Sequence, residues 1–104
     1  MKIAVATTDG ITVNEHFGRT SNFYIYVITS DGPVKVAEAT AEPLSTGDKK
    51  HPFDPDRFQS IVSVLKGCER VYVTQIGERP AAELKKAGIE PVIYQGEVNS
   101  ISLD

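Results

Sequence analysis

The chain has 104 residues, of which 40% are hydrophobic and 24% are charged, and its formal net charge at pH 7 is −3. These values predict one globular domain over residues 1–104, and no apolar run approaches the ~18 residues of a membrane span. The negative charge argues against nucleic acid as a partner, because phosphate binding needs clustered lysine and arginine. A single cysteine and the absence of a signal-peptide pattern favour a cytoplasmic protein with no membrane partner.

The first forty residues predict three strands, the first two joined by a polar loop and the last two by a hairpin turn. Residues 1–6 form a short apolar run that stops at a turn signal, Thr7-Thr8-Asp9-Gly10. In residues 22–29, apolar side chains alternate onto both faces, which predicts a strand covered on both sides. Ser30-Asp31-Gly32 is typical of a hairpin turn, so residues 33–39 are predicted to be the returning strand.

The segment 40–53 has little hydrophobic periodicity and contains three breaker residues, Pro43, Gly47 and Pro52. We therefore expect a loop there, and expect it to be the most mobile internal segment. Its histidine, His51, follows two lysines and is interpreted as a solvated side chain, with a second metal ligand as the alternative.

A helix is predicted to begin at Asp54-Pro55, because Asp54 can cap free backbone amides and proline suits the first helical position. Apolar residues at i, i+3, i+4 and i+7 define its buried face, and Gly67 is expected to end it in a left-handed conformation. The remaining chain predicts a strand over 70–74, a helix over 80–87 ended by Gly88, a strand over 89–94, and a short final helix over 97–104 with Val98 and Ile101 inward.

The resulting order is βββαβαβ with a short final helix. A meander of three strands followed by crossover helices predicts an α/β fold, a five-stranded mixed sheet with helices on its faces. Ligands of such sheets lie beyond the carboxyl ends of the parallel strands. Residues 7–18 and 74–78 leave two such ends, and we expect them to frame one crevice if their strands are neighbours.

The loop over residues 7–18 contains the strongest functional signal, His16-Phe17-Gly18. Imidazole is a good ligand for iron, zinc, copper or nickel. Phe17 can anchor the loop to the core, and Gly18 gives backbone freedom beside the histidine. Backbone amides at the second loop and its helix start favour an anion, and Arg19 would lie with His16 at the rim.

Several segments together resemble the dinitrogenase iron-molybdenum cofactor biosynthesis family. They are Met1-Lys-Ile-Ala-Val-Ala-Thr, Asp9-Gly10, His16-Phe17-Gly18, Phe23-Tyr-Ile-Tyr26, Cys68-Glu-Arg-Val-Tyr-Val, Ile76-Gly77, Leu84 and Ala87-Gly88-Ile89-Glu90-Pro91. The resemblance covers nearly the whole chain, and the opening motif is its most specific part.

The resemblance implies a ribonuclease H-like fold and a small non-enzymatic carrier or scaffold for an iron-sulfur or iron-molybdenum-type cluster. The family's cofactor-ligating histidine falls at His16. The other residues we expect at the cofactor site are Gly10, Gly18, Arg19, Gln75 and Gly77. A lone histidine is a sparse site, so the cluster would be bound transiently, with further ligands of its own or from a cofactor-assembly or acceptor protein.

Two other functions are alternatives to a carrier. A ribonuclease H-like nuclease would place an acid near Asp9, but two-metal chemistry needs several converging carboxylates, and the strand ending Val73-Thr74-Gln75 supplies none. A metal-free interaction module remains the alternative to a carrier. For single residues, the bland interpretations are a turn former for Asp9, backbone roles for Gly10 and Gly18, and a small buried side chain for Cys68, with a second ligand as its alternative.

Overall fold

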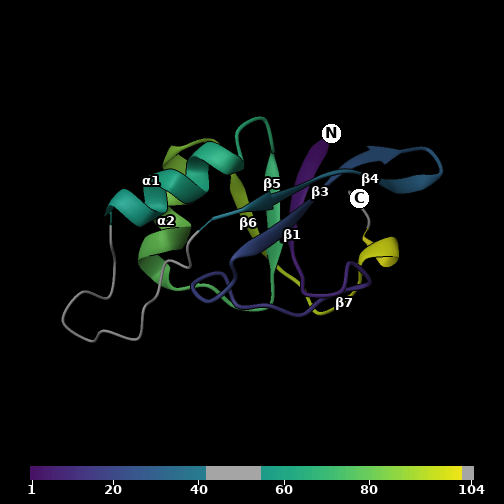
Figure 1. Cartoon of the computed structure of the whole chain (residues 1–104), viewed down its shortest axis with the longest axis horizontal. Helices are drawn as coiled ribbons and strands as arrows, with labels where there is room; N and C mark the ends of the chain where they lie inside the picture. The colour runs from purple at the N-terminus through teal and green to yellow at the C-terminus, as the bar shows by residue number, and fades with distance from the viewer. Residues whose placement is uncertain (42–54, 102–104) are drawn as a thin grey trace.

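The computed structural model describes residues 1–41 and 55–101, and its central feature is a five-stranded mixed sheet (Figure 1). The strands lie in the order β4 (Gly32–Thr40), β3 (Asn22–Thr29), β1 (Lys2–Ala6), β5 (Arg70–Val73) and β6 (Glu90–Ile93). β1 is antiparallel to β3 and parallel to β5, and β5 is parallel to β6. The five-stranded mixed sheet predicted from the sequence is therefore confirmed, and the parallel strands β1, β5 and β6 end at a common edge.

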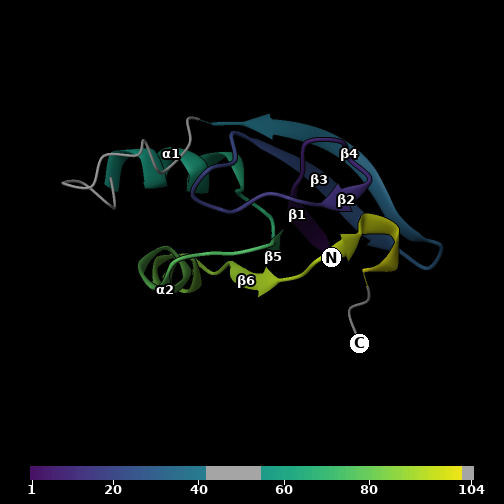
Figure 2. The same ribbon diagram turned by 90° about the horizontal axis from the view of Figure 1, so that it is seen from below.

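Both α-helices pack against the same face of this sheet, which we call the helix face (Figure 2). Phe58, Ile61 and Leu65, in or just after α1 (Pro55–Val64), and Leu84 of α2 (Glu78–Lys86) share one buried cluster with strand residues. The expectation of helices on both faces is thus wrong for the α-helices. Within residues 1–41 and 55–101, none of the helices is long and apolar enough to span a membrane.

The opposite face is covered by a small two-stranded ribbon, β2 (Thr12–Val13) with β7 (Gly96–Glu97), and by a single 3-10 turn, η1 (Val98–Ser100). A second buried cluster joins them to the sheet; it contains Ile3, Val5, Val13, Tyr26, Tyr72, Val98 and Ile101. The predicted final helix is therefore wrong at its start, because Glu97 pairs with Thr12 in the ribbon. The inward positions of Val98 and Ile101 are confirmed.

Strand β3 is covered on both faces, as its alternation predicted. Phe23 and Ile25 belong to the cluster under the helices, and Tyr26 belongs to the cluster on the opposite face. Left-handed glycines follow both helices, with φ of +91° at Gly67 and +85° at Gly88. These angles agree with the predicted helix ends, because only glycine adopts them without strain.

The expected loop over residues 40–53 falls largely outside the described residues. Thr40 itself is the last residue of β4, so the strand is longer than predicted. Ala41 continues its alignment by donating its amide N–H to the Ser21 carbonyl at 3.0 Å. The expected mobility of the loop, the role of His51 and the cap at Asp54 all lie outside the described residues.

Candidate functional site

The loop that follows β1 is organised by its own polar side chains. Thr7 Oγ1 accepts the amide N–H groups of Asp9 and Gly10 at 3.2 and 3.0 Å, and donates to Asp9 Oδ1 at 3.1 Å. The same carboxylate oxygen accepts the amides of Ile11 and Thr12 at 2.8 and 3.0 Å. These backbone hydrogen bonds lower the pKa of Asp9, because they stabilise its charged form. Asp9 is therefore the turn former that its sequence context suggested.

A second pair of side chains closes the same loop. Asn14 Oδ1 accepts the Thr8 amide at 3.0 Å, and Asn14 Nδ2 donates to Thr8 Oγ1 at 2.8 Å. These two hydrogen bonds between Asn14 and Thr8 hold the end of the loop next to its beginning. Nothing in the hydrophobic pattern of the sequence could show this closure, because it is made by short polar side chains six positions apart.

Gly10 is required by the backbone and by close packing. Its φ is +73°, and a Cβ built there would lie 2.5 Å from Cε2 of Tyr24. Tyr26 Oη also donates to the Gly10 carbonyl at 3.2 Å. These contacts agree with the interpretation that Gly10 acts through its backbone, and they fix the loop against the two tyrosines of β3.

The ribbon formed with β7 fixes the middle of the loop. Thr12 pairs with Glu97 and Val13 with Gly96, and the Val98 amide donates to the Ile11 carbonyl at 2.8 Å. Val98 is 1% exposed, so the chain that follows β6 is anchored in the core and holds the loop from outside. The sequence analysis missed both ribbon strands, because two-residue strands carry no periodicity.

The two loops that the sequence placed at the carboxyl edge do lie side by side. The Phe17 amide donates to the Gln75 carbonyl at 2.9 Å, and the Thr74 amide donates to the Glu15 carbonyl at 3.0 Å. His16 and Gln75 thereby form an isolated parallel β-bridge. The prediction that these loops meet is confirmed, because β1 and β5 are neighbours as it required.

Phe17 anchors the histidine motif to the core. Its side chain is fully buried, and its ring centroid lies 6.1 Å from that of Phe23. The adjacent residues His16 and Gly18 are half-buried and buried, respectively. The anchor holds the histidine backbone at the edge of the sheet while leaving part of the imidazole accessible.

The imidazole of His16 makes a specific hydrogen bond. Its Nδ1 accepts the amide N–H of Gly18 at 3.0 Å, and its backbone carbonyl accepts the amides of Arg19 and Thr20 at 3.0 and 3.1 Å. An accepting Nδ1 cannot carry the proton of a neutral ring, so that proton is on Nε2. In this conformation Nε2 of the neutral His16 ring is a hydrogen-bond donor.

The remaining predicted residues surround this histidine motif. Arg19 is exposed next to it, and Gln75 contributes its carbonyl to the bridge while its side chain is exposed. Gly77 is the N-cap of α2 and has no side-chain cap, so the positive end of the helix dipole lies two residues beyond the bridge. His16, Gly18, Arg19, Gln75 and Gly77 are thus brought into one region of the carboxyl edge.

Cys68 does not belong to this region. It is 6% exposed within the cluster under the helices, and burial raises the pKa of its thiol. It precedes β5, whereas Gln75 follows the same strand, so the whole length of β5 separates the two residues. Within residues 1–41 and 55–101, no three His, Cys, Asp or Glu side chains are grouped so as to hold a metal ion.

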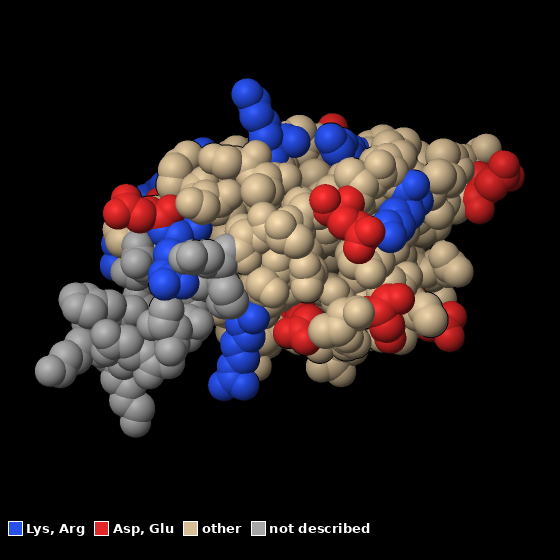
Figure 3. All heavy atoms as spheres, viewed as in Figure 1, with Lys and Arg blue, Asp and Glu red and all other residues tan. Residues whose placement is uncertain are grey.

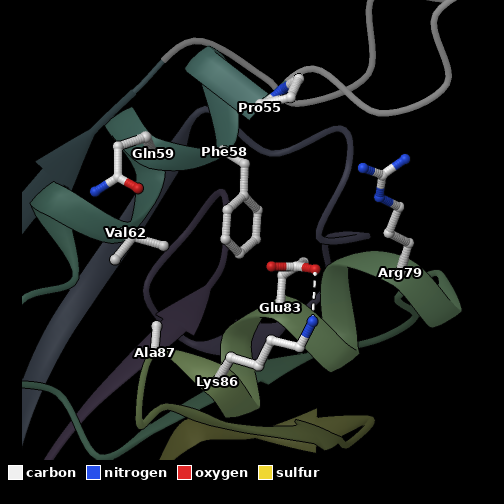
Figure 4. A pocket seen from close by; sticks show the side chains of 8 residues that line it. All are labelled: Pro55, Phe58, Gln59, Val62, Arg79, Glu83, Lys86 and Ala87. Carbon is white, nitrogen blue, oxygen red and sulfur yellow. Dashed lines mark hydrogen bonds and ion pairs between the residues drawn. The ribbon is translucent and has the colours of Figure 1, made fainter.

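An open groove of about 430 Å³ lies between the two helices (Figure 4). Phe58 and Val62 of α1 and Ala87 beyond α2 form its apolar surface. Glu83 and Lys86 stand on the other side and form an ion pair at 3.3 Å. The sequence could not show this groove, because its two walls are separated by the whole of β5.

The five-stranded mixed sheet and the histidine loop bridged to Gln75 define a small α/β protein. The chain is matched over residues 1–102 by the family described as dinitrogenase iron-molybdenum cofactor. The chain belongs to that family, which confirms the resemblance drawn from its sequence.

Relatives with assigned names agree with this membership. The chain is 36% identical over 90 residues to the FeMo cofactor biosynthesis protein NifB of Herbaspirillum seropedicae, covering 86% of the chain and 17% of that protein. It is 33% identical over 93 residues to the protein NifX of Sinorhizobium fredii, covering 88% of the chain and 58% of NifX. The chain therefore spans only part of the length of both relatives.

A solved structure supports the fold. The crystal structure of PH0822 superimposes with a TM-score of 0.67 at 22% identity, covering 95% of this chain and 84% of that one. At this identity the likeness concerns the fold alone.

Proposed function

We propose that this protein takes part in iron-molybdenum cofactor biosynthesis as a non-enzymatic carrier or scaffold that binds an anionic iron-sulfur or iron-molybdenum-type cluster transiently. The observation that carries the proposal is His16, half-buried at the carboxyl edge and held there by Phe17 and by the bridge to Gln75. Membership of the family, together with the similarity to NifB, which is named a FeMo cofactor biosynthesis protein, supports the cargo class.

The surroundings of His16 suit an anionic cargo. Exposed Arg19 adds a positive charge, and the uncapped start of α2 adds the positive end of a helix dipole. Gly77 is exposed and has no side chain, so it leaves room for close approach of a bulky cluster to the backbone. We keep Gly10 in the proposed site as the residue that shapes the loop from its far end.

Direct metal ligation by His16 has a structural consequence. A neutral imidazole that gives its Nε2 lone pair to a metal carries its proton on Nδ1, where it can no longer accept the Gly18 amide. Ligation would therefore break this hydrogen bond and free the Gly18 N–H to donate to a sulfide of the cluster. Such a reversible exchange suits a carrier, which must release its cargo to an assembly or acceptor protein.

The decisive experiment compares His16 variants by anaerobic titration with isolated cofactor or a 4Fe–4S cluster donor. His16→Ala should lower affinity at least tenfold, about 1.4 kcal/mol. His16→Asn is the sharper variant, because its side-chain oxygen can still accept the Gly18 amide but it has no Nε2 atom. It should keep the loop and lose the same affinity.

Cys68→Ala serves as the matched control. Because this buried thiol lies at the other end of β5, the change should cost roughly 1 kcal/mol of stability and leave cluster binding intact. Loss of the cluster from a folded Cys68→Ala protein would make Cys68 a ligand. Equal binding by wild type and His16→Ala, or binding by neither, would remove the carrier function and leave a metal-free interaction module.

Three further parts of the proposal concern the type of fold, nuclease activity and the location of the protein. A ribonuclease H-like fold is supported by the strand order, in which β1 lies between the antiparallel strands β3 and β4 on one side and the parallel strands β5 and β6 on the other. The absence of nuclease activity is supported by Asp9, whose carboxylate already binds two backbone amides. A cytoplasmic location rests on the single cysteine.

A further inference from the structure

The two edges of the five-stranded sheet differ in their protection. β6 has four residues and contains Pro91, which has no amide N–H to offer another strand. β4 has nine residues, and its proline is confined to the second position. Val34 and Val36 of β4 are 49% and 53% exposed. The outer edge of β4 thus presents a long row of backbone N–H and C=O groups beside exposed apolar side chains.

A bulge in β4 arranges its charged side chains. Ile25 pairs with Ala37 but the next residue, Tyr26, pairs with Lys35, so Val36 is an extra residue in the strand. The bulge puts Lys35 and Glu38 on the same face of the sheet although they are three positions apart. Their side chains form an ion pair at 3.2 Å, and a basic and an acidic side chain lie side by side over the β3–β4 hairpin in Figure 3.

We propose that β4 pairs with β4 of a second copy of this chain, antiparallel about a twofold axis between Val36 and Ala37. Lys35 of each copy then lies opposite Glu38 of the other. The apolar residues also match, because Val36 lies opposite Ala37 and Val34 opposite Ala39. The strand is therefore complementary to itself in both charge and hydrophobicity, as a twofold interface requires.

The bulge is compatible with this antiparallel register of the two β4 strands. Lys35 and Glu38 pair with Tyr26 and Tyr24 of β3, so both face away from the helices. Val34 and Ala39 pair with Val27 and Phe23, which places both on the helix face. Each opposing pair thus shares a face, and the same extra residue occurs in both strands. A sheet edge gains its missing main-chain partners by such pairing.

The test uses sedimentation velocity of the full chain between ~10 μM and ~1 mM, where weak strand-edge contacts are measurable. The wild type should show a dimer whose fraction rises with concentration and falls with added salt. Lys35→Glu and Glu38→Lys should each weaken association at least tenfold, because like charges then face each other across the interface. Lys66→Glu, an exposed change beyond α1, is the control that should leave association unchanged.

Mixing Lys35→Glu with Glu38→Lys distinguishes pairing across the interface from an effect of the Lys35–Glu38 ion pair within one chain. An equimolar mixture of Lys35→Glu and Glu38→Lys should associate again, because one chain then carries two acids and the other two bases at the facing positions. The pair within each chain stays repulsive in the mixture. A monomer throughout the concentration range, a dimer indifferent to both variants, or a mixture that stays monomeric would each overturn the proposal.

Discussion

The two segments that meet at the carboxyl edge are fixed in different ways. The loop between β1 and β3 is long, and its shape depends on side chains: Thr7, Asp9 and Asn14 bond its backbone, and Phe17 anchors it in the core. The segment from Thr74 to Gly77, which joins β5 to α2, is short and is held by main-chain hydrogen bonds with Glu15 and Phe17. A long loop has more conformational entropy to lose, so it needs more contacts of its own. Side-chain changes should therefore damage the first segment and spare the second.

The largest loss of unfolding free energy is expected at Phe17, which anchors the first segment in the core. Phe17→Ala removes a fully buried ring from the cluster under the helices and should cost about 3–5 kcal/mol of unfolding free energy. Gln75→Ala changes the residue bridged to this motif, but its bond is made by the carbonyl, so the cost should stay within about 0.5 kcal/mol. Denaturant unfolding measures both. Comparable losses in the two variants would contradict the difference between the segments.

Alanine substitutions at Gly10 and Gly77 compare the two segments by steric fit, and the expected loss of stability is smaller than at Phe17. Gly10→Ala must adopt a φ of +73° and push against Tyr24, which should cost about 1–3 kcal/mol. Gly77→Ala has a φ of −72°, and its added carbon would meet Pro80 Cδ at 3.4 Å, an ordinary contact. Its effect should stay within about 0.5 kcal/mol. Thermal melts of the two proteins give the comparison, and a stable Gly10→Ala would show that the loop can reshape.

The smallest effect concerns the acid dependence of the first loop. The pKa of Asp9 is lowered from its ordinary 3.8 by the Thr12 and Ile11 amides, so its carboxylate stabilises the fold above that value. The stabilisation should fade as the pH falls through the lowered pKa. We expect the difference in unfolding free energy between wild type and Asp9→Asn to shrink in this acid range. A difference that stays constant down to about pH 2 would show that the charge of Asp9 is not what holds the turn.

The sequence by itself determined the strands and helices whose apolar residues recur at a regular spacing. The alternation over residues 22–29 predicted a strand buried on both faces, and the helical spacing from Phe58 to Leu65 predicted the face that α1 buries. It also placed the histidine motif in the loop after the first strand, whereas the position of that strand beside β5 was an expectation from the family fold. These features are local or follow from strand adjacency, so their residues carry the information directly.

Only the tertiary structure decided how the site is held. The ribbon of β2 with β7, the bond from Gly18 to His16 and the packing of Gly10 under Tyr24 join residues by polar or single contacts that leave no pattern. The same reason explains why both α-helices share one face, since amphipathic spacing defines a buried side but not the side of the sheet it meets. The tautomer of His16 follows from its hydrogen bond with Gly18, and the position of Lys35 and Glu38 on one face of β4 follows from the pairing of that strand with β3.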